Sequence, residues 1–198
     1  MRGDELTPWL VQYAYRQGAF PMADDEDQTI RWYQPYVRAL LPIEGIHVSR
    51  SLARTIRKER FQVRFDTAFE RVMRSCLRPE IEGNWISEDI IRTYTEIHHL
   101  GWAHCAECWE GESLVGGAYG IAIGSCFCAE SMFHRRTDAS KVALWALVRK
   151  CRELGFTMFD AQIMTEHLRS LGAFEVSHRE YMKRLRTAMD RKTPWSGE

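Results

Sequence analysis

The spacing of apolar residues changes near residue 103. Before that point apolar positions recur every three or four residues, which predicts helices over 8–17, over 49–60, after Asp66 and from Ser87 to Gly101. Beyond it, longer apolar or alternating runs predict strands over 103–109, 114–123 and 125–133. A helix over 139–154, a strand over 156–162, a short helix over 165–171, a strand over 174–176 and a helix over 181–189 complete the chain. Helices, then an antiparallel meander, then a β-α-β-α unit predict an α+β fold.

Local signals mark several element ends. Serine or aspartate ahead of an apolar-periodic run is a preferred N-cap, which predicts helix starts at Ser49, Asp66 and Ser87. The segment 110–113 (Glu-Gly-Glu-Ser) predicts a hairpin turn, and the glycine pair at 116–117 predicts a bulge. Residues 32–41 contain Pro35, precede Pro42 and show no clear period, so no regular element is predicted there.

Composition and charge narrow the class of protein. The 198 residues are 45% apolar and 27% charged, which is typical of a globular chain of one domain with at most a small appendage. The 27 basic and 27 acidic residues cancel, which excludes a generally basic nucleic-acid binder. The charges are nevertheless segregated, since residues 47–78 hold 9 basic and 3 acidic side chains whereas residues 79–134 hold 1 and 9. This segregation predicts a polyanion on one surface and a cation near another.

The cysteines and the chain termini predict a cytoplasmic protein. No apolar run is long enough to span a membrane, and the N-terminus lacks the apolar region of a signal peptide. Six cysteines in a chain with this much core fit a reducing compartment better than a disulfide scaffold. Cys105 and Cys108 have the spacing of a zinc knuckle, but on a strand they point to opposite faces. We therefore expect buried thiols and no metal site.

The glycine-rich segment 116–124 suggests packing and not a nucleotide site. No Gly-Lys-Ser/Thr follows it, and it does not open a helix, so it matches neither a P-loop nor a dinucleotide fingerprint. Bulges and close strand packing explain it better. The chain also lacks the Gly-x-Ser-x-Gly elbow of many hydrolases.

Polar residues inside apolar strands are the candidates for chemistry. Glu130 alternates with Cys128 and Met132, and Asp160 alternates with Gln162, so we expect each set to share one strand face. A carboxylate on a buried strand is costly unless it is paired or functional, and pairing with an arginine or a backbone group is the alternative. Trp85, between a loop and a helix start, either stacks on a base or belongs to the core.

Short segments over most of the chain form one further, ordered pattern. They are Tyr15-Arg-Gln-Gly-Ala-Phe-Pro21, Ile30-Arg-Trp32, 35–39, His47-Val-Ser-Arg-Ser51, 61–63, Glu82-Gly-Asn-Trp-Ile86, 100–104, Leu114-Val-Gly-Gly117 with Tyr119-Gly120, Phe127-Cys-Ala-Glu-Ser-Met-Phe133, 139–141, Asp160-Ala-Gln162 and 170–173. In this order they resemble the bacterial leucyl/phenylalanyl-tRNA–protein transferases. The resemblance extends from about residue 3 to residue 181 and is far more specific than any single motif.

The resemblance implies a fold and an activity. It implies a small, shortened N-terminal domain over residues 1–36 and, over residues 37–198, a catalytic domain of the GCN5-related acyltransferase (GNAT) fold, with a mixed, largely antiparallel sheet flanked by helices. It implies transfer of leucine, phenylalanine or methionine from aminoacyl-tRNA to the α-amine of proteins beginning with Arg or Lys, which marks them for N-end rule degradation. The resemblance implies a cytoplasmic monomer. No cofactor is expected, because no Gln/Arg-x-x-Gly-x-Gly loop for coenzyme A precedes Ala139.

The resemblance also implies roles for individual residues. Gln162 would contact the reacting ester and amine, Asp160 would orient Gln162, and Glu130 would hold the donor's amino group or 3′ ribose. The residues implied in substrate binding are Trp85, Phe127 and Arg50 at the 3′-terminal adenosine, Met22 where the family usually has a stacking tryptophan, and Leu144, Leu147 and Phe159 around the donor side chain.

Three other functions stay open at this point. They are a related transferase with another acceptor, a catalytically idle RNA-binding module and a coenzyme-A acetyltransferase. Glu130, Asp160 and Gln162 occurring together favour an active enzyme. We expect the arginines of residues 50–78 and the basic C-terminal third to receive the tRNA backbone, and the acidic stretch 79–134 to attract a cationic acceptor.

Overall fold

A seven-stranded sheet forms the centre of the chain. The computed structural model describes residues 6–24, 27, 29–77 and 85–195. Within these residues the strand order is β4-β5-β6-β7-β8-β3-β9, and β7 and β8 are parallel while the other neighbours are antiparallel. In chain order the strands are β3 (Val37–Leu41), β4 (Gln62–Phe65), β5 (Ala103–Glu110), β6 (Ser113–Ile123), β7 (Cys126–His134), β8 (Met158–Gln162) and β9 (Phe174–Ser177). The predicted α+β class with a mixed, mostly antiparallel sheet is confirmed.

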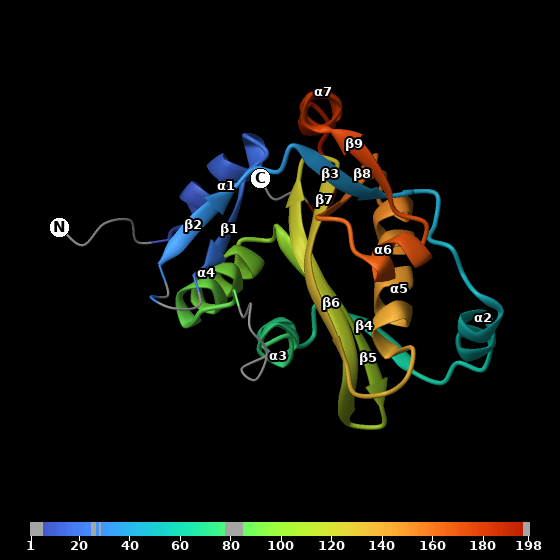
Figure 1. Cartoon of the computed structure of the whole chain (residues 1–198). Coiled ribbons are helices and arrows are strands. Elements are labelled where there is room, and N and C mark those ends of the chain that lie inside the picture. The colour runs from blue at the N-terminus through green and yellow to red at the C-terminus, as the bar shows by residue number, and fades with distance from the viewer. Residues whose placement is uncertain (1–5, 25–26, 28, 78–84, 196–198) are drawn as a thin grey trace.

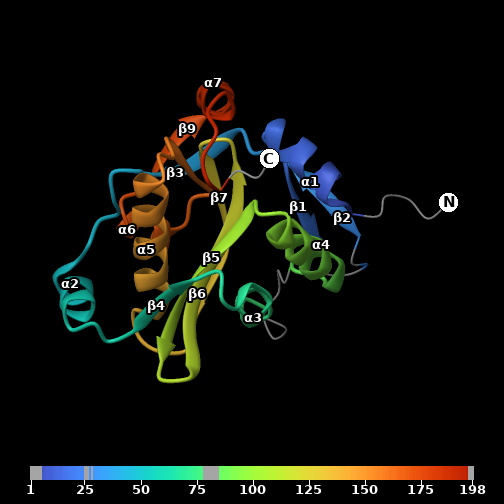
Figure 2. The same cartoon turned by 180° about the vertical axis from the view of Figure 1, so that it is seen from behind.

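Helices cover both faces of this sheet (Figures 1 and 2). One face packs against α1 (Pro8–Arg16), α3 (Phe69–Ser75), α4 (Glu88–His99) and α7 (His178–Met189). The other face packs against α5 (Ala139–Glu153), with α2 (Arg50–Arg57) and α6 (Glu166–Ser170) beside it. A separate hairpin of β1 (Phe20–Ala23) and β2 (Ile30–Tyr33) lies next to α1.

Alternation along the central strands explains their unbroken apolar sequence. Cys105 faces the core cluster beneath α3 and α4, whereas Cys108 faces the cluster beneath α5. Because both faces are covered, both sets of side chains are apolar. The predicted opposition of Cys105 and Cys108 is confirmed, and all six cysteines are buried and free of disulfides.

Most of the predicted elements are present, with errors at several ends, such as the helix predicted over 49–60, which ends at Arg57. Ser49 and Ser87 cap α2 and α4, accepting hydrogen bonds from the backbone N–H of Leu52 (3.2 Å) and Ile90 (3.3 Å). The predicted cap at Asp66 is wrong: Ala68 occupies the N-cap of α3, and Asp66 instead accepts a hydrogen bond from the Cys105 backbone N–H. The last helix begins at His178, three residues before its predicted start.

Four short strands were not predicted. β1, β2, β3 and β4 contain four or five residues each, too few for a clear apolar period. The omission of β3 matters most, because it is an interior strand between β8 and β9.

The glycines of β6 allow close packing, as predicted. A Cβ on Gly120 would lie 2.2 Å from a backbone oxygen of β7, and one on Gly116 would lie 2.5 Å from the Cβ of Ala139 in α5. The predicted bulge lies beside the glycine pair, at Val115, where the pairing of β5 with β6 shifts.

Candidate active site

Glu130 lies at a second β-bulge, in β7. Ala129 and Ser131 pair with consecutive residues of β6, so Glu130 between them has no cross-strand partner. The extra residue reverses the alternation, because Cys128 packs in the cluster beneath α1, α3 and α4 whereas Met132 packs in the cluster beneath α5. The prediction that Cys128, Glu130 and Met132 share one strand face is therefore wrong.

The Glu130 carboxylate is held by two donors from distant parts of the chain. Its Oε1 accepts hydrogen bonds from the Tyr15 hydroxyl of α1 (2.6 Å) and from Nε2 of Gln162 (2.8 Å). The Tyr15 hydroxyl also lies 2.9 Å from the hydroxyl of Tyr94 in α4. Burial raises the pKa of Glu130 to about 7, although the Tyr15 and Gln162 hydrogen bonds act in the opposite direction.

Asp160 forms a buried ion pair with Arg38. The guanidinium of Arg38 binds the carboxylate twice, Nη2 to Oδ2 at 2.7 Å and Nε to Oδ1 at 2.9 Å, and the Tyr181 hydroxyl donates to Oδ2 at 2.9 Å. Burial lowers the pKa of Arg38, but the Asp160 charge and hydrogen bonds outweigh it and hold the pKa above its ordinary value. Arg38 also donates to the Gly18 carbonyl, which ties the N-terminal segment to this pair.

Gln162 links the two carboxylates. Its backbone N–H donates to Oδ1 of Asp160 at 2.8 Å, while its side chain donates to Glu130. The Gln162 backbone has φ of +62°, a conformation that few residues other than glycine adopt. Asp160 thus fixes the backbone that presents the Gln162 amide.

Glu130 and Gln162 line a cavity of about 500 Å³. Such a volume suits a small-molecule ligand. Glu130, Ser131 and Gln162 form its polar part, with Thr165 and His167. The other residues around the cavity are apolar: Phe20, Met22, Leu41, Cys76, Trp85, Ile86, Ala118, Ala129, Met132, Leu144, Ala161, Ile163 and Leu168.

Met22 and Trp85 line the cavity together. The backbone N–H of Ala23, next to Met22 in β1, donates to the Trp85 carbonyl at 3.0 Å, which holds the two segments side by side. Both side chains are only partly buried and pack against the core beneath α1 and α4. An aromatic ring beside a flexible thioether is a surface on which a flat ring can stack.

Comparison with known proteins decides the family. The family model described as leucyl/phenylalanyl-tRNA protein transferase matches residues 40–186, and the model of its N-terminal domain matches residues 4–35. The chain belongs to the leucyl/phenylalanyl-tRNA–protein transferase family. The family resemblance inferred from the sequence is thereby confirmed.

Relatives carrying the same name match almost from end to end. The transferase of Paramagnetospirillum magneticum is 49% identical over 196 residues, covering 96% of this chain and 92% of the relative. Those of Chlorobium luteolum and Chlorobium limicola are 50% and 47% identical, cover 91% and 92% of this chain, and are themselves covered over 94% and 95%. Among solved structures, L-PGS from Bacillus licheniformis aligns with 87% of this chain and 60% of its own at 14% identity; the TM-score is 0.42, too low to assign a fold.

The residues implied by the transferase resemblance fall into two groups. Glu130, Gln162, Met22, Trp85 and Leu144 all line the cavity. The others do not: Asp160, Phe127, Leu147 and Phe159 are at most 1% exposed, and Arg50 is exposed on α2.

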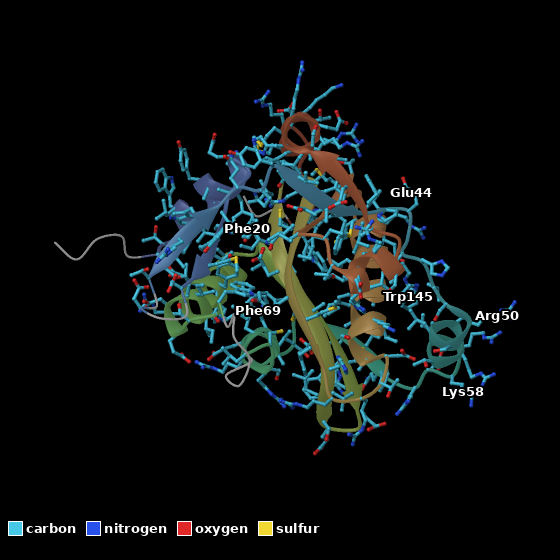
Figure 3. All side chains as sticks on the ribbon, viewed as in Figure 1. Phe20, Glu44, Arg50, Lys58, Phe69 and Trp145 are labelled. Carbon is cyan, nitrogen blue, oxygen red and sulfur yellow. The ribbon has the colours of Figure 1, made fainter. Side chains whose placement is uncertain are left out.

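Phe127 and Arg50 are the clearest examples of implied site residues that lie outside the cavity. Phe127 points to the α5 face of β7 and stacks on Phe159 at 5.2 Å between ring centres, so its ring belongs to the core. Arg50 and Lys58 lie at the two ends of α2, at the outer edge of the molecule and well away from Phe20 at the cavity (Figure 3). Neither side chain lines the cavity, so neither would touch a ligand bound there.

Sequence reasoning gave no role to Arg38, Tyr15 or Tyr181. Each is at most 1% exposed, and each bonds one of the two carboxylates. Arg38 directly precedes the apolar run 39–41. A charged residue beside such a run was the signal in the sequence that could have indicated a buried ion pair.

The charged blocks interleave in space. Arg74 of the basic block binds Glu88 of the acidic stretch at 2.8 Å, and Arg136 of the basic C-terminal third binds Glu110 at 3.1 Å. Among the described residues, the expected separation of opposite charges onto two faces is therefore incomplete. Within the described ranges, no helix combines the length and the apolar character needed to cross a membrane.

Proposed function

We propose that this chain transfers leucine or phenylalanine, and also methionine, from aminoacyl-tRNA to the α-amine of proteins that begin with Arg or Lys. The observation that carries the proposal is the division of one cavity into a polar part, with Glu130 and Gln162, and an apolar part that includes Met132 and Leu144. An aminoacyl ester with an apolar side chain has the same two parts. The family name supports both the donor and the protein acceptor.

The reaction needs positioning more than activation. Aminolysis of an ester by an amine is downhill, so an enzyme gains most by holding the two reactants in the attacking geometry. Gln162, fixed through its backbone by Asp160, would contact the ester and the incoming amine. Glu130 lies 2.8 Å from the Gln162 amide, within reach of the same reacting atoms.

The donor would enter with its adenosine against Trp85 and Met22. Stacking of a base on an aromatic side chain contributes about 1–3 kcal/mol. Its aminoacyl side chain would lie against Leu144, while Leu147 and Phe159 support that wall from within the core. Phe127 would act in the same indirect way, and Arg50 would bind the tRNA backbone beyond the cavity.

The proposal includes the domain organisation, the oligomeric state and the compartment of the protein. A division into an N-terminal domain over residues 1–36 and a catalytic domain over residues 37–198 is supported by the two family models, which meet between residues 35 and 40. We expect the second domain to have a GNAT-like fold. We expect a monomer that acts in the cytoplasm and marks its products for degradation. Six buried free cysteines agree with a reducing compartment.

A transfer assay tests the proposal. Leu-, Phe- and Met-tRNA carrying radiolabelled amino acids are each incubated with peptides that begin with Arg, Lys, Asp or Glu, and label in the peptide is measured. We expect label on the Arg and Lys peptides, strongly reduced in Gln162→Ala and kept in the control Glu153→Gln, whose carboxylate pairs with Arg149 on the surface of α5. Label on acidic peptides alone would indicate a transferase with another acceptor. Binding of tRNA without any transfer would indicate an RNA-binding module.

A further inference from the structure

The two carboxylates of the site, Asp160 and Glu130, differ in their free hydrogen-bond acceptor capacity. All polar contacts of Asp160 are internal: Oδ1 accepts from Arg38 Nε and the Gln162 backbone, and Oδ2 accepts from Arg38 Nη2 and the Tyr181 hydroxyl. Asp160 is 0% exposed and does not line the cavity. A carboxylate with four donors and a buried guanidinium has no remaining acceptor site for a substrate proton.

Glu130 has the opposite arrangement. It lines the cavity, and only its Oε1 is engaged, by Tyr15 and Gln162. Its Oε2 is buried and has no hydrogen-bond partner among the described residues. A buried carboxylate oxygen without a donor is costly, so its retention at a cavity wall points to a donor brought by the ligand.

The third polar residue of the site is not a base. The Gln162 amide donates its N–H to Glu130, and a neutral amide does not take up a proton near neutral pH. Among Asp160, Gln162 and Glu130, only Glu130 therefore combines a titratable group with free acceptor capacity beside the cavity.

We infer that Glu130, and not Asp160, takes the proton that the attacking α-ammonium must lose, and returns it to the departing ribose oxygen. The inference rests on the proposed transfer and assigns its proton acceptor. Arg38 and Tyr181 act as positioning residues, because they hold Asp160 and through it the Gln162 backbone.

The step forms one C–N bond, breaks one C–O bond and releases one proton. The ammonium gives one proton to Glu130, and the resulting neutral amine attacks the ester carbonyl carbon. The new C–N bond forms as the C–O bond to the ribose breaks, and Glu130 gives its proton to the ribose oxygen. The second N–H proton of the adduct goes to water, which leaves an amide, a ribose hydroxyl and one released proton.

The surroundings of Glu130 suit this task. Burial raises its pKa to about 7, and a terminal α-amine has a pKa of about 8, so proton transfer between them is close to balanced. The titratable and charged groups that act on Glu130 come from several elements: Tyr15 of α1, Tyr94 of α4, Tyr119 of β6, Arg38 of β3 and Asp160 of β8. Burial keeps the pKa values of the three tyrosines well above 10, so they stay neutral in the working range.

The test is the pH dependence of transfer. The kcat/KM for an Arg-starting peptide is measured at saturating Leu-tRNA from pH 5.5 to 8.5, with the peptide's own amine ionisation determined separately and divided out. The wild type should show an enzyme ionisation near pH 7, separate from that of His167 in the same cavity, whose pKa burial lowers from its ordinary value. Glu130→Gln should be about 100-fold slower or more and lack that ionisation. Gln162→Ala should be slower and keep it.

Controls separate chemistry from folding and from the proposed function. Glu130→Asp, which retains a carboxylate, should regain part of the rate with a shifted ionisation, and Glu153→Gln should match the wild type. An ionisation near pH 7 that persists in Glu130→Gln, or a wild-type profile without one, overturns the inference. Failure of the wild type to transfer any amino acid would instead refute the proposed function.

Discussion

Replacing Glu130 by glutamine should favour the folded state more above neutral pH than at low pH, while it slows transfer. Burial shifts the pKa of Glu130 from an ordinary value of 4.5 to about 7. Below pH 4.5 the side chain is neutral in both the folded and the unfolded chain. As pH rises from 4.5 to 7, the unfolded chain releases the proton first, so folding stability falls, and above pH 7 the full cost is present.

The magnitude follows from the size of this shift. At about 1.4 kcal/mol per pKa unit, it corresponds to about 3 kcal/mol. Glutamine keeps the shape and an oxygen that accepts from Tyr15, but carries no charge to bury. We therefore expect Glu130→Gln to gain roughly 1–3 kcal/mol at pH 8 relative to its effect at pH 4.

Urea unfolding at the two pH values measures this difference. The free energy of unfolding of the wild type, Glu130→Gln and the surface control Glu153→Gln is determined at pH 4 and at pH 8, with the slope m as a check on two-state behaviour. Comparing the pH difference between variants cancels packing effects that do not depend on charge. A Glu130→Gln effect that is equal at both pH values, or more destabilising at pH 8, would refute the reasoning.

Three further predictions follow from the same geometry. Arg38→Met leaves the Asp160 carboxylate buried without its counter-ion and should cost about 3–5 kcal/mol in urea unfolding, part of which a second substitution, Asp160→Leu, should restore. Arg54→Glu with Arg57→Glu should weaken tRNA binding, measured by fluorescence anisotropy, and flatten its salt dependence; unchanged affinity at low salt would place the tRNA elsewhere. Gly120→Ala forces a Cβ to 2.2 Å from a backbone oxygen of β7 and should cost about 1–3 kcal/mol in thermal unfolding; a neutral effect would contradict the close packing.

Long elements were predictable because their patterns are local. The period of α4 and α5 and the apolar runs of β5–β7 each extend over eight or more residues, so they are visible without tertiary information. β3 was missed because it has five residues between prolines and begins with an exposed valine followed by Arg38. The charge of Arg38 is satisfied by Asp160, 122 residues further along the chain, and no local pattern signals that pairing.

The candidate site was predicted by residue type but not by geometry. Glu130 and Gln162 were identified because polar groups in apolar strands are unusual, and both line the cavity. The bulge that puts Cys128 and Met132 on opposite faces leaves no mark in the sequence, because it depends on how β6 pairs with β7. The partner Tyr15, 115 residues earlier, follows only from the packing of α1 against the sheet.

The interleaving of charges changes how a cationic acceptor would be attracted. Glu88 and Glu110 of the acidic stretch are paired with arginines of the flanking basic blocks, and Glu107 is fully buried among hydrogen-bond donors. These three carboxylates therefore contribute little to long-range attraction of the acceptor. Inside the cavity, low dielectric strengthens the short-range interaction of a single carboxylate with an ammonium. Glu130 is the carboxylate that lines the cavity, so acceptor binding should depend on this residue and respond only weakly to salt.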